Sequence, residues 1–133
     1  MSKIIWITGR VNTGKTTLAK RLCKLHDNAV LLDSDILRDI FLFGGFTKDN
    51  RDSWVTKVAL LAKELFDQGF IPIVAIMSPY KETRKEVFKK ILGRRNVVLV
   101  YLPGGEDRMW KGSVYEEPTK EEASIFIKRQ REI

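Results

Sequence analysis

The stretch from Gly9 to Thr17, which reads GRVNTGKTT, constrains the fold more than any other part of the chain. It directly follows the apolar run at residues 4–7 and directly precedes a helix-like segment at residues 18–25. A buried strand, a glycine-bounded loop and a Lys-Thr pair at the start of a helix together form the P-loop pattern GxxxxGK[ST]. The pattern predicts a nucleoside triphosphate site at the end of the first strand.

The residue types of this loop suit the binding of phosphate. Main-chain N–H groups of such a loop and of the following helix N-terminus point at one spot, where they stabilise an anion. A Cβ at Gly9 or Gly14 would block the turn or the approach of phosphate oxygens. We expect ATP and Mg²⁺ as cofactors, with Lys15 on the β- and γ-phosphates and the Thr16 hydroxyl on the metal. The loop residues predicted to bind the nucleotide are Gly9, Asn12, Thr13, Gly14, Lys15, Thr16 and Thr17.

Length and composition indicate one globular domain over residues 1–133. Hydrophobic residues make up 44% of the 133 positions and charged residues 31%, as in a folded, water-soluble domain. No apolar run approaches the roughly 20 residues that cross a bilayer, and residues 1–3 lead directly into a strand without a signal peptide pattern. We therefore expect a cytoplasmic protein without a membrane partner.

The formal net charge of +7 has two interpretations. Much of it lies in the segment 81–95, and a basic segment can bind nucleic acid. We favour the other interpretation, the solvated side of a helix, because residues 87, 88, 91 and 92 are apolar at helical spacing. The basic residues are Lys81, Arg84, Lys85, Lys89, Lys90, Arg94 and Arg95. We expect an anionic small-molecule substrate and no nucleic-acid partner, and we allow for a homodimer.

Apolar runs alternate with helical patterns along the chain. The predicted strands cover residues 3–8, 29–33, 71–77 and 96–102, and the predicted helices cover residues 14–26, 35–43, 51–68, 81–92 and 120–131. Gly69 is expected to end the third helix, and Thr119 to cap the last. The alternation predicts an α/β fold of the three-layer P-loop type, a doubly wound parallel sheet of about four strands in the order 2-3-1-4.

Polar residues follow the end of each predicted strand, and ligands of such sheets bind beyond those ends. After the second strand come Asp33 and Asp35, which strand alternation would put on one side. A carboxylate there can simply cap a helix. We favour a catalytic pair instead, one carboxylate holding Mg²⁺ and the other orienting or deprotonating an acceptor hydroxyl. Arg108 and Lys111 follow the fourth strand and are expected to contact the nucleotide.

Four segments resemble motifs of one family, the adenylylsulfate (APS) kinases. Residues 32–38 (LDSDILR) resemble that family's LDGDxxR, and residues 45–51 (GFTKDNR) are similar to its GFSxxDR. Residues 76–80 (IMSPY) with Arg84 resemble ISPYxxxR, and Lys111 with Gly112 resembles KGLY. The four motifs occur in the family's order and at similar spacing over residues 4–115.

This resemblance implies transfer of the ATP γ-phosphate to the 3′-hydroxyl of APS, giving PAPS, a step of sulfate assimilation. It also implies that Arg38 and Arg51 grip the phosphosulfate or ribose side of the acceptor, that Phe46 stacks on its adenine, and that Ile76 and Ser78 line its pocket. Some accounts of the family assign a phosphoserine to the position of Ser78. We expect direct in-line transfer. The catalytic residues expected are Lys15, Asp33, Asp35 and Ser78, the metal ligands Thr16 and Asp33, and Asp35 is also expected to contact the acceptor.

The chain departs from the family's pattern at three positions. Trp54 stands where an asparagine is expected to touch the acceptor, Thr56 replaces an arginine, and Met109 replaces an aspartate of the lid. The lid looks reduced and a usual fifth strand looks absent, so closure over ATP is expected to be less complete. These departures leave open another nucleotide-linked or small hydroxyl acceptor, and the short lid leaves open a nucleotide-binding module with little turnover. A sugar-type small-molecule kinase would share the P-loop and the sheet order, and the positive charge would suit a nucleic-acid 5′-hydroxyl kinase.

Overall fold

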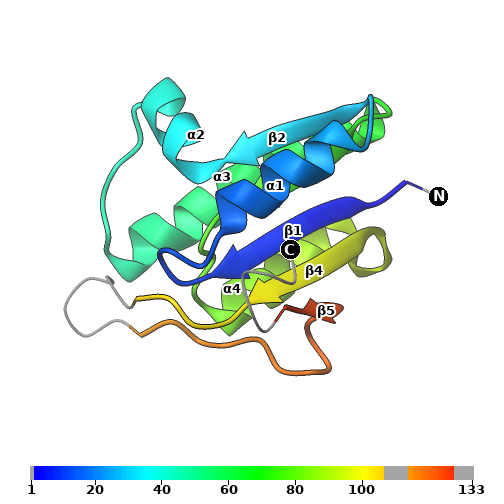
Figure 1. Cartoon of the computed structure of the whole chain (residues 1–133). Coiled ribbons are helices and arrows are strands. Elements are labelled where there is room, and N and C mark those ends of the chain that lie inside the picture. Colours follow the sequence, from blue (N-terminus) through cyan, green and yellow to red (C-terminus); the bar gives the residue numbers. More distant parts are fainter. Residues whose placement is uncertain (1, 107–113, 128–133) are drawn as a thin grey trace.

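The computed structural model describes residues 2–106 and 114–127 and has a parallel sheet at its centre (Figure 1). The strands are β1 (Ile4–Gly9), β2 (Ala29–Asp33), β3 (Ile71–Ala75), β4 (Val97–Leu102) and β5 (Ile125–Phe126). Their spatial order is β2-β3-β1-β4-β5, and all four neighbouring pairs run parallel. The predicted α/β class and the order of the first four strands are confirmed, whereas the expected absence of a fifth strand is wrong, because β5 pairs with β4.

Alternate residues of β1, β2, β3 and β4 enter two separate cores. In β1, Ile4 and Trp6 are buried on one face of the sheet and Ile7 on the other, because successive side chains of a strand point to opposite faces. Helix α1 (Lys15–Lys24) covers the Ile7 face. The other face is covered by α3 (Lys48–Asp67) and by the π-helix η1 (Val87–Leu92), which continues α4 (Lys81–Glu86) (Figure 1). Burial on both faces explains the near-continuous apolar runs.

Local capping decides where the longest helix begins and ends. The Thr47 side chain accepts a hydrogen bond of 3.1 Å from the Asn50 N–H, so α3 begins at Lys48, three residues before the predicted start. The helix ends at Asp67, and Gly69 follows with a φ of 96°, which confirms the predicted stop. The short helix α2 (Ser34–Phe41) follows β2 directly, and a single 3₁₀ turn, η2 (Arg94–Asn96), precedes β4.

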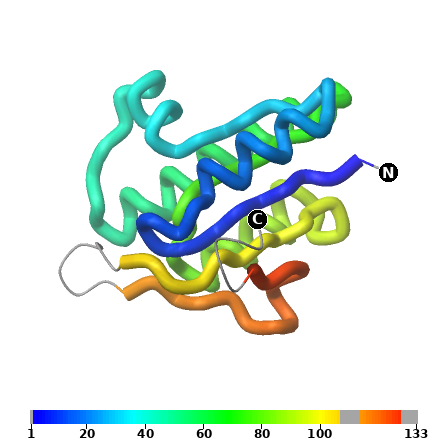
Figure 2. The backbone as a smooth tube through the Cα atoms, in the orientation of Figure 1, coloured from blue at the N-terminus to red at the C-terminus, as the bar shows by residue number. Residues whose placement is uncertain are grey.

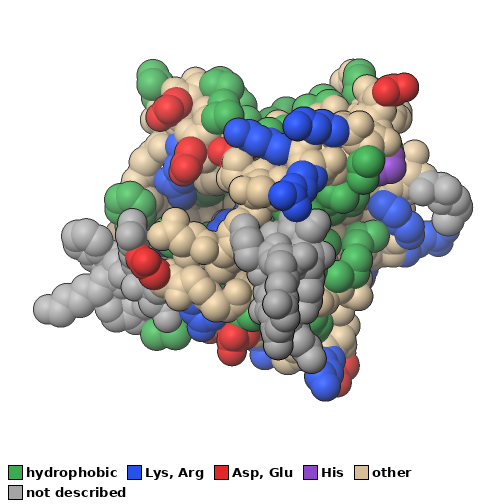
Figure 3. All heavy atoms as spheres, in the orientation of Figure 1, with side chains coloured by type: hydrophobic (Ala, Val, Ile, Leu, Met, Phe, Trp, Pro, Cys, Tyr) green, Lys and Arg blue, Asp and Glu red, His purple; other side chains and the backbone are tan. Residues whose placement is uncertain are grey.

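Most of the basic segment at residues 81–95 is solvated, with one exception. Its lysines and Arg94 and Arg95 are exposed, whereas Arg84 is completely buried. Including Arg84 in the solvated side was therefore wrong. Arg84 is tolerated in the interior because it donates to two main-chain carbonyls and pairs with the Glu122 carboxylate. Other basic side chains gather on the face that carries α1 (Figure 3), whose last turn holds Arg21 and Lys24.

The predicted helix at residues 120–131 is wrong over its described part. The Thr119 hydroxyl accepts a hydrogen bond from the Glu122 N–H, but it caps a single turn only. The chain then runs beside β4 as β5, where Val100 pairs with Ile125 (Figure 2). Without this strand the outer edge of β4 would present unpaired N–H and C=O groups, and pairing them outweighs the local helical pattern. In the described residues, no helix is both long and apolar enough to span a membrane.

Candidate active site

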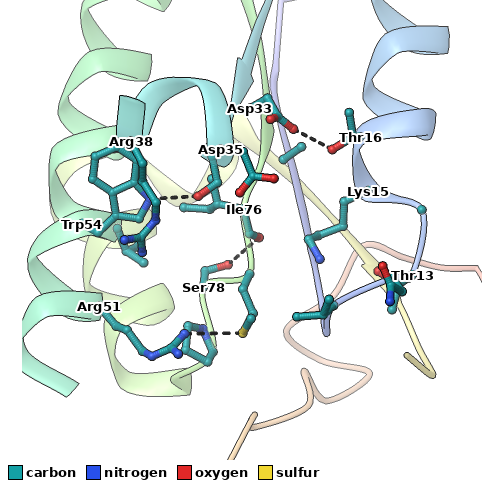
Figure 4. A pocket seen from close by; sticks show the side chains of 18 of the residues that line it. Thr13, Lys15, Thr16, Asp33, Asp35, Arg38, Arg51, Trp54, Ile76 and Ser78 are labelled. Carbon is teal, nitrogen blue, oxygen red and sulfur yellow. Dashed lines mark hydrogen bonds between the residues drawn. The ribbon is translucent and has the colours of Figure 1, made fainter. Parts of the chain in front are cut away.

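A cavity of about 600 Å³ opens at the carboxyl ends of β1, β2 and β3. Its wall is formed by the P-loop, the start of α2, the start of α3 and the segment after β3 (Figure 4). Thirteen of the predicted site residues line it, and Gly9 does not: the thirteen are Asn12, Thr13, Gly14, Lys15, Thr16, Thr17, Asp33, Asp35, Arg38, Phe46, Arg51, Ile76 and Ser78. Arg108 and Lys111 lie outside the described residues.

The P-loop is held in a conformation that only a few residue types allow. Gly14 has a φ of 95° and Asn12 a φ of 64°, both in the left-handed region that glycine and asparagine tolerate. A Cβ at Gly9 would lie 2.6 Å from the Leu102 carbonyl oxygen. The loop is also paired through main-chain hydrogen bonds between Val11 and Glu106. Glycine and asparagine at these positions, together with the pairing to Glu106, fix the main-chain conformation of the loop.

Lys15 at the end of the loop donates two hydrogen bonds to the loop itself. Its Nζ lies 2.9 Å from the Gly9 carbonyl oxygen and 2.6 Å from the Arg10 carbonyl oxygen. Burial lowers the pKa of Lys15 to about 8, and the nearby carboxylates of Asp35 and Asp33 oppose this shift. The ammonium group is therefore poorly solvated, and an incoming phosphate would restore the charge stabilisation that water does not provide.

Thr16 and Asp33 bring together two oxygen ligands of the kind that Mg²⁺ prefers. The Thr16 hydroxyl donates a hydrogen bond of 2.6 Å to the Asp33 carboxylate (Figure 4). Asp33 is buried at the end of β2, and Thr16 lies in the first turn of α1. A hydroxyl and a carboxylate beside a phosphate-binding loop fit a magnesium ion bound with ATP.

Asp35 lies across the cavity from the P-loop. It is exposed in the first turn of α2, and Figure 4 shows its carboxylate pointing into the space between α2 and Lys15. The expected strand alternation does not operate, because α2 already begins at Ser34. The start of a helix nevertheless brings Asp33 and Asp35 to the same cavity. The Asp35 carboxylate is therefore exposed, whereas the Asp33 carboxylate is buried.

Two arginines and an aromatic ring form the far wall. The buried Arg51 side chain donates from Nε to the Phe46 carbonyl oxygen at 3.1 Å, and its guanidinium carbon lies 5.5 Å from the Phe46 ring centroid. Phe46 itself is 54% exposed. Burial lowers the pKa of both Arg38 and Arg51, and the Arg51 charge lowers that of Arg38 further. Two cationic groups therefore face one cavity, an arrangement suited to an anion.

The Ser78 hydroxyl lies on the inner side of the cavity within a hydrogen-bond chain. It accepts from the Trp6 indole N–H at 3.0 Å and donates to the Thr8 hydroxyl at 3.0 Å. The Thr8 hydroxyl is in turn 2.8 Å from the Tyr115 hydroxyl. Burial raises the pKa of Tyr115 well above its usual value. Ser78 also has a φ of 41°, and Arg84 Nη1 donates to its carbonyl oxygen at 2.8 Å.

Trp54 is the cavity residue whose role the sequence did not indicate. Its side chain is almost completely buried, its indole N–H donates to the Ser34 hydroxyl at 3.1 Å, and its ring stacks on Phe43 with centroids 5.0 Å apart. The guanidinium carbon of Arg38 lies 5.0 Å from the same ring. An apolar residue at this position of an amphipathic helix predicts burial, but its partners on α2 are distant in sequence.

Comparisons with known proteins agree on one family. The family model described as adenylylsulphate kinase matches residues 1–109. A probable adenylyl-sulfate kinase of Pyrococcus abyssi is 35% identical, over 94% of this chain and 85% of its own length. An adenylyl-sulfate kinase of Chloroflexus aurantiacus is 38% identical over 63% of this chain, which here spans only 48% of the relative.

A solved structure shows the same fold. The APS kinase CysC of Mycobacterium tuberculosis, in complex with AMPPNP and APS, superimposes with a TM-score of 0.76 at 21% identity. The match covers 95% of this chain and 87% of that one. At this identity the likeness establishes the fold, and the family model together with the Pyrococcus relative establishes the family. The chain belongs to the adenylylsulphate kinase family.

Proposed function

We propose that this chain transfers the γ-phosphoryl group of ATP to the 3′-hydroxyl of adenylylsulfate, giving PAPS and ADP. One observation carries the proposal: a single cavity joins the phosphate-binding loop to a wall with two guanidinium groups and an exposed aromatic ring. The first part suits a triphosphate, and the second suits an adenosine with an anionic tail. The APS kinase CysC of Mycobacterium tuberculosis, which was solved in complex with AMPPNP and APS, supports the same pair of ligands.

On the donor side, Lys15 would exchange its bonds to the Gly9 and Arg10 carbonyls for the β- and γ-phosphates. Thr16 and Asp33 would hold Mg²⁺, which neutralises phosphate charge when bound. The main-chain N–H groups of the loop would stabilise the remaining charge.

On the acceptor side, Asp35 would orient or deprotonate the attacking hydroxyl, since it is the exposed carboxylate across from Lys15. Arg38 and Arg51 would bind the phosphosulfate, and Phe46 would stack on the adenine. Ile76 and Ser78 would line the pocket. The Ser78 hydroxyl is buried and bonded to Trp6 and Thr8, which supports a positioning role and direct transfer to the acceptor.

A second acceptor is favoured by one specific observation. Trp54 occupies the position at which an asparagine would touch the acceptor, and it offers a ring where an amide would offer hydrogen bonds. Another nucleotide-linked or small hydroxyl compound with an anionic group would satisfy the same two arginines. A cytoplasmic location and a homodimer stay predictions.

The test is a coupled assay of ADP release with ATP and Mg²⁺, comparing APS with other nucleotides and with sugar acceptors. We expect saturation by APS at lower concentration than by any other compound. Lys15→Ala should lower kcat by about 10²–10³-fold, because one preorganised charge contact on the transferring group is lost. Lys20→Ala, an exposed residue of the same helix, is the control and should leave the rate unchanged. If a different acceptor saturates the enzyme at lower concentration, that acceptor replaces APS in the proposal. Absence of turnover with every acceptor would contradict the proposal that the chain is a kinase.

A further inference from the structure

The Trp54 side chain contacts α2 at two points one turn apart. Its indole N–H donates to the Ser34 hydroxyl at the first residue of α2, and its ring lies under the Arg38 guanidinium at 5.0 Å (Figure 4). Phe43, just after the helix, stacks on the ring with an interplanar angle of 21°. Trp54 belongs to α3. Its side chain alone therefore connects α3 to two successive turns of α2.

Arg38 needs such a contact because its electrostatic surroundings are unfavourable. Its side chain is partly buried, and the charge of Arg51 on the same wall of the cavity repels it. Asp35 attracts it, but Asp35 is the smallest of the three influences on the Arg38 pKa. A guanidinium free to rotate would turn toward solvent and away from Arg51. The face of an indole ring attracts a cation and can hold it where repulsion would otherwise move it.

We propose that Trp54 is a positioning residue that holds the Arg38 guanidinium toward the cavity, so that Arg38 and Arg51 form one anion-binding pair before the acceptor arrives. The pair then selects acceptors that carry an anionic group in reach of both guanidinium groups. Trp54 acts through Arg38 and contributes no hydrogen bond to the acceptor itself, because its N–H is used by Ser34. The identity of the acceptor rests on the proposed function, whereas the action of Trp54 on Arg38 does not.

The kinetic test compares Trp54→Leu with Trp54→Phe. Both side chains fill the apolar site, but only phenylalanine keeps a ring face for Arg38 at position 54. The Phe43 ring, whose centroid lies 5.8 Å from the Arg38 guanidinium carbon, is present in both variants. We expect Trp54→Leu to raise the acceptor KM by about 3- to 30-fold with little change in kcat or in the KM for ATP, and Trp54→Phe to stay within about threefold of the wild type. A general loss of structure would lower kcat and affect both KM values. Equal KM values for the two variants would overturn the proposal.

A double-mutant cycle separates action through Arg38 from direct action. In an Arg38→Ala background, Trp54→Leu should change the acceptor KM by no more than about twofold, because the group that it positions is absent. Additive effects of the two substitutions would contradict the proposal. Lys57→Ala is the matched control, since Lys57 lies 5.4 Å over the Phe43 ring in the same aromatic cluster but is not part of the cavity wall. It should leave the KM unchanged.

An NMR experiment tests the contact between Trp54 and Arg38 without an acceptor and without the leucine variant. The chain has three tryptophans, so ¹H–¹⁵N spectra should show three indole signals, and Trp54→Phe assigns one of them. Arg38→Ala should shift the Trp54 signal, whereas Lys63→Ala, which removes a half-exposed side chain of α3 paired with Asp67, should leave it in place. An unmoved Trp54 signal would overturn the proposal. If the Trp54 signal shifts but the protein does not use APS, the action of Trp54 on Arg38 stands and only the proposed acceptor is refuted.

Discussion

The hydroxyl of Thr16 donates a hydrogen bond of 2.6 Å to the carboxylate of Asp33, joining the first turn of α1 to the last residue of β2. The two residues are 17 positions apart in the chain. They meet because β2 and β1 both end at the same edge of the sheet, with β3 between them. The hydrogen bond marks the place where the proposed magnesium ion would bind. Substitution of Asp33 therefore tests the proposed metal site directly.

Asp33→Asn should abolish most of the activity and leave the fold intact. The amide oxygen of asparagine can still accept the Thr16 hydrogen bond, but the negative charge that attracts Mg²⁺ is gone. We expect kcat to fall by about 10²–10³-fold, measured as ADP release across a magnesium titration. Asp39→Asn, an exposed carboxylate of α2, is the control. An Asp33→Asn enzyme with the wild-type rate and magnesium dependence would contradict the metal-binding role.

Lys15 should take up protons when ADP binds near pH 8. Its pKa is lowered from 10.5 to about 8 by burial, so about half of the free protein carries a neutral Lys15 at that pH. Phosphate restores the charged form and raises the pKa again. Titration calorimetry in two buffers of different ionisation enthalpy should show proton uptake near pH 8 and almost none near pH ~6.5. Uptake that persists in Lys15→Met would assign it to another group.

The same pKa shift has a consequence for stability. Between about pH 8 and pH 10.5 the unfolded chain keeps the Lys15 proton while the folded protein has begun to lose it. The unfolded state then binds more protons, so the contribution of Lys15 to the free energy of unfolding rises with pH across this window. Below about pH 8 Lys15 is charged in both states and its contribution does not change with pH. Urea titrations of the wild type and Lys15→Met should diverge in this window, and parallel curves would refute the shift.

Gly9→Ala should destabilise the protein and weaken nucleotide binding. The added Cβ would lie 2.6 Å from the Leu102 carbonyl oxygen and 2.9 Å from the Thr13 hydroxyl, and the first of these is main chain of β4 that cannot move aside without disturbing the sheet. We expect a loss of about 1–3 kcal/mol in the free energy of unfolding. Gly44→Ala is the control, because a Cβ there would meet no atom within 4 Å. Chemical denaturation of both variants measures the difference, and equal stabilities would contradict the prediction.

Glu122→Gln should lower the stability through Arg84. Arg84 Nε and Nη2 lie 2.8 Å and 3.2 Å from the two Glu122 carboxylate oxygens, and the Arg84 side chain is fully buried. Glutamine can accept one of these hydrogen bonds but leaves the buried guanidinium charge uncompensated. We expect a loss of about 1.5–3 kcal/mol, measured by urea unfolding. The exposed neighbour variant, Glu121→Gln, should stay near the wild type, and a similar loss there would show that Arg84 is not the cause.

The residues that could be predicted act locally or follow from the architecture. The P-loop is recognisable because its function depends on main-chain conformation, and Gly9 and Gly14 report that conformation directly. Asp33 and Asp35 were placed near it by the rule that ligands bind at the carboxyl edge of a parallel sheet, even though Asp35 reaches the cavity from a helix.

The predictions that were wrong concern residues whose partners are remote in sequence. The local sequence pattern predicts that Arg84 is a solvated helix residue. In the structure it is buried, because Glu116 provides a carbonyl partner and Glu122 a carboxylate partner. Residues 120–127 have a helical pattern, but Ile125 and Phe126 lie against the outer edge of β4, where main-chain pairing makes them β5. In both cases local propensity is weaker than a tertiary contact.

By itself, the sequence determined the P-loop after the first strand, the α/β class and the order of the first four strands, because turn geometry and the alternation of apolar runs are encoded by neighbouring residues. Only the tertiary structure decided that Trp54 lies under Arg38, that Arg84 is buried and that β5 completes the sheet. These contacts join residues from separate elements, and their energies depend on distances and burial that no local pattern specifies.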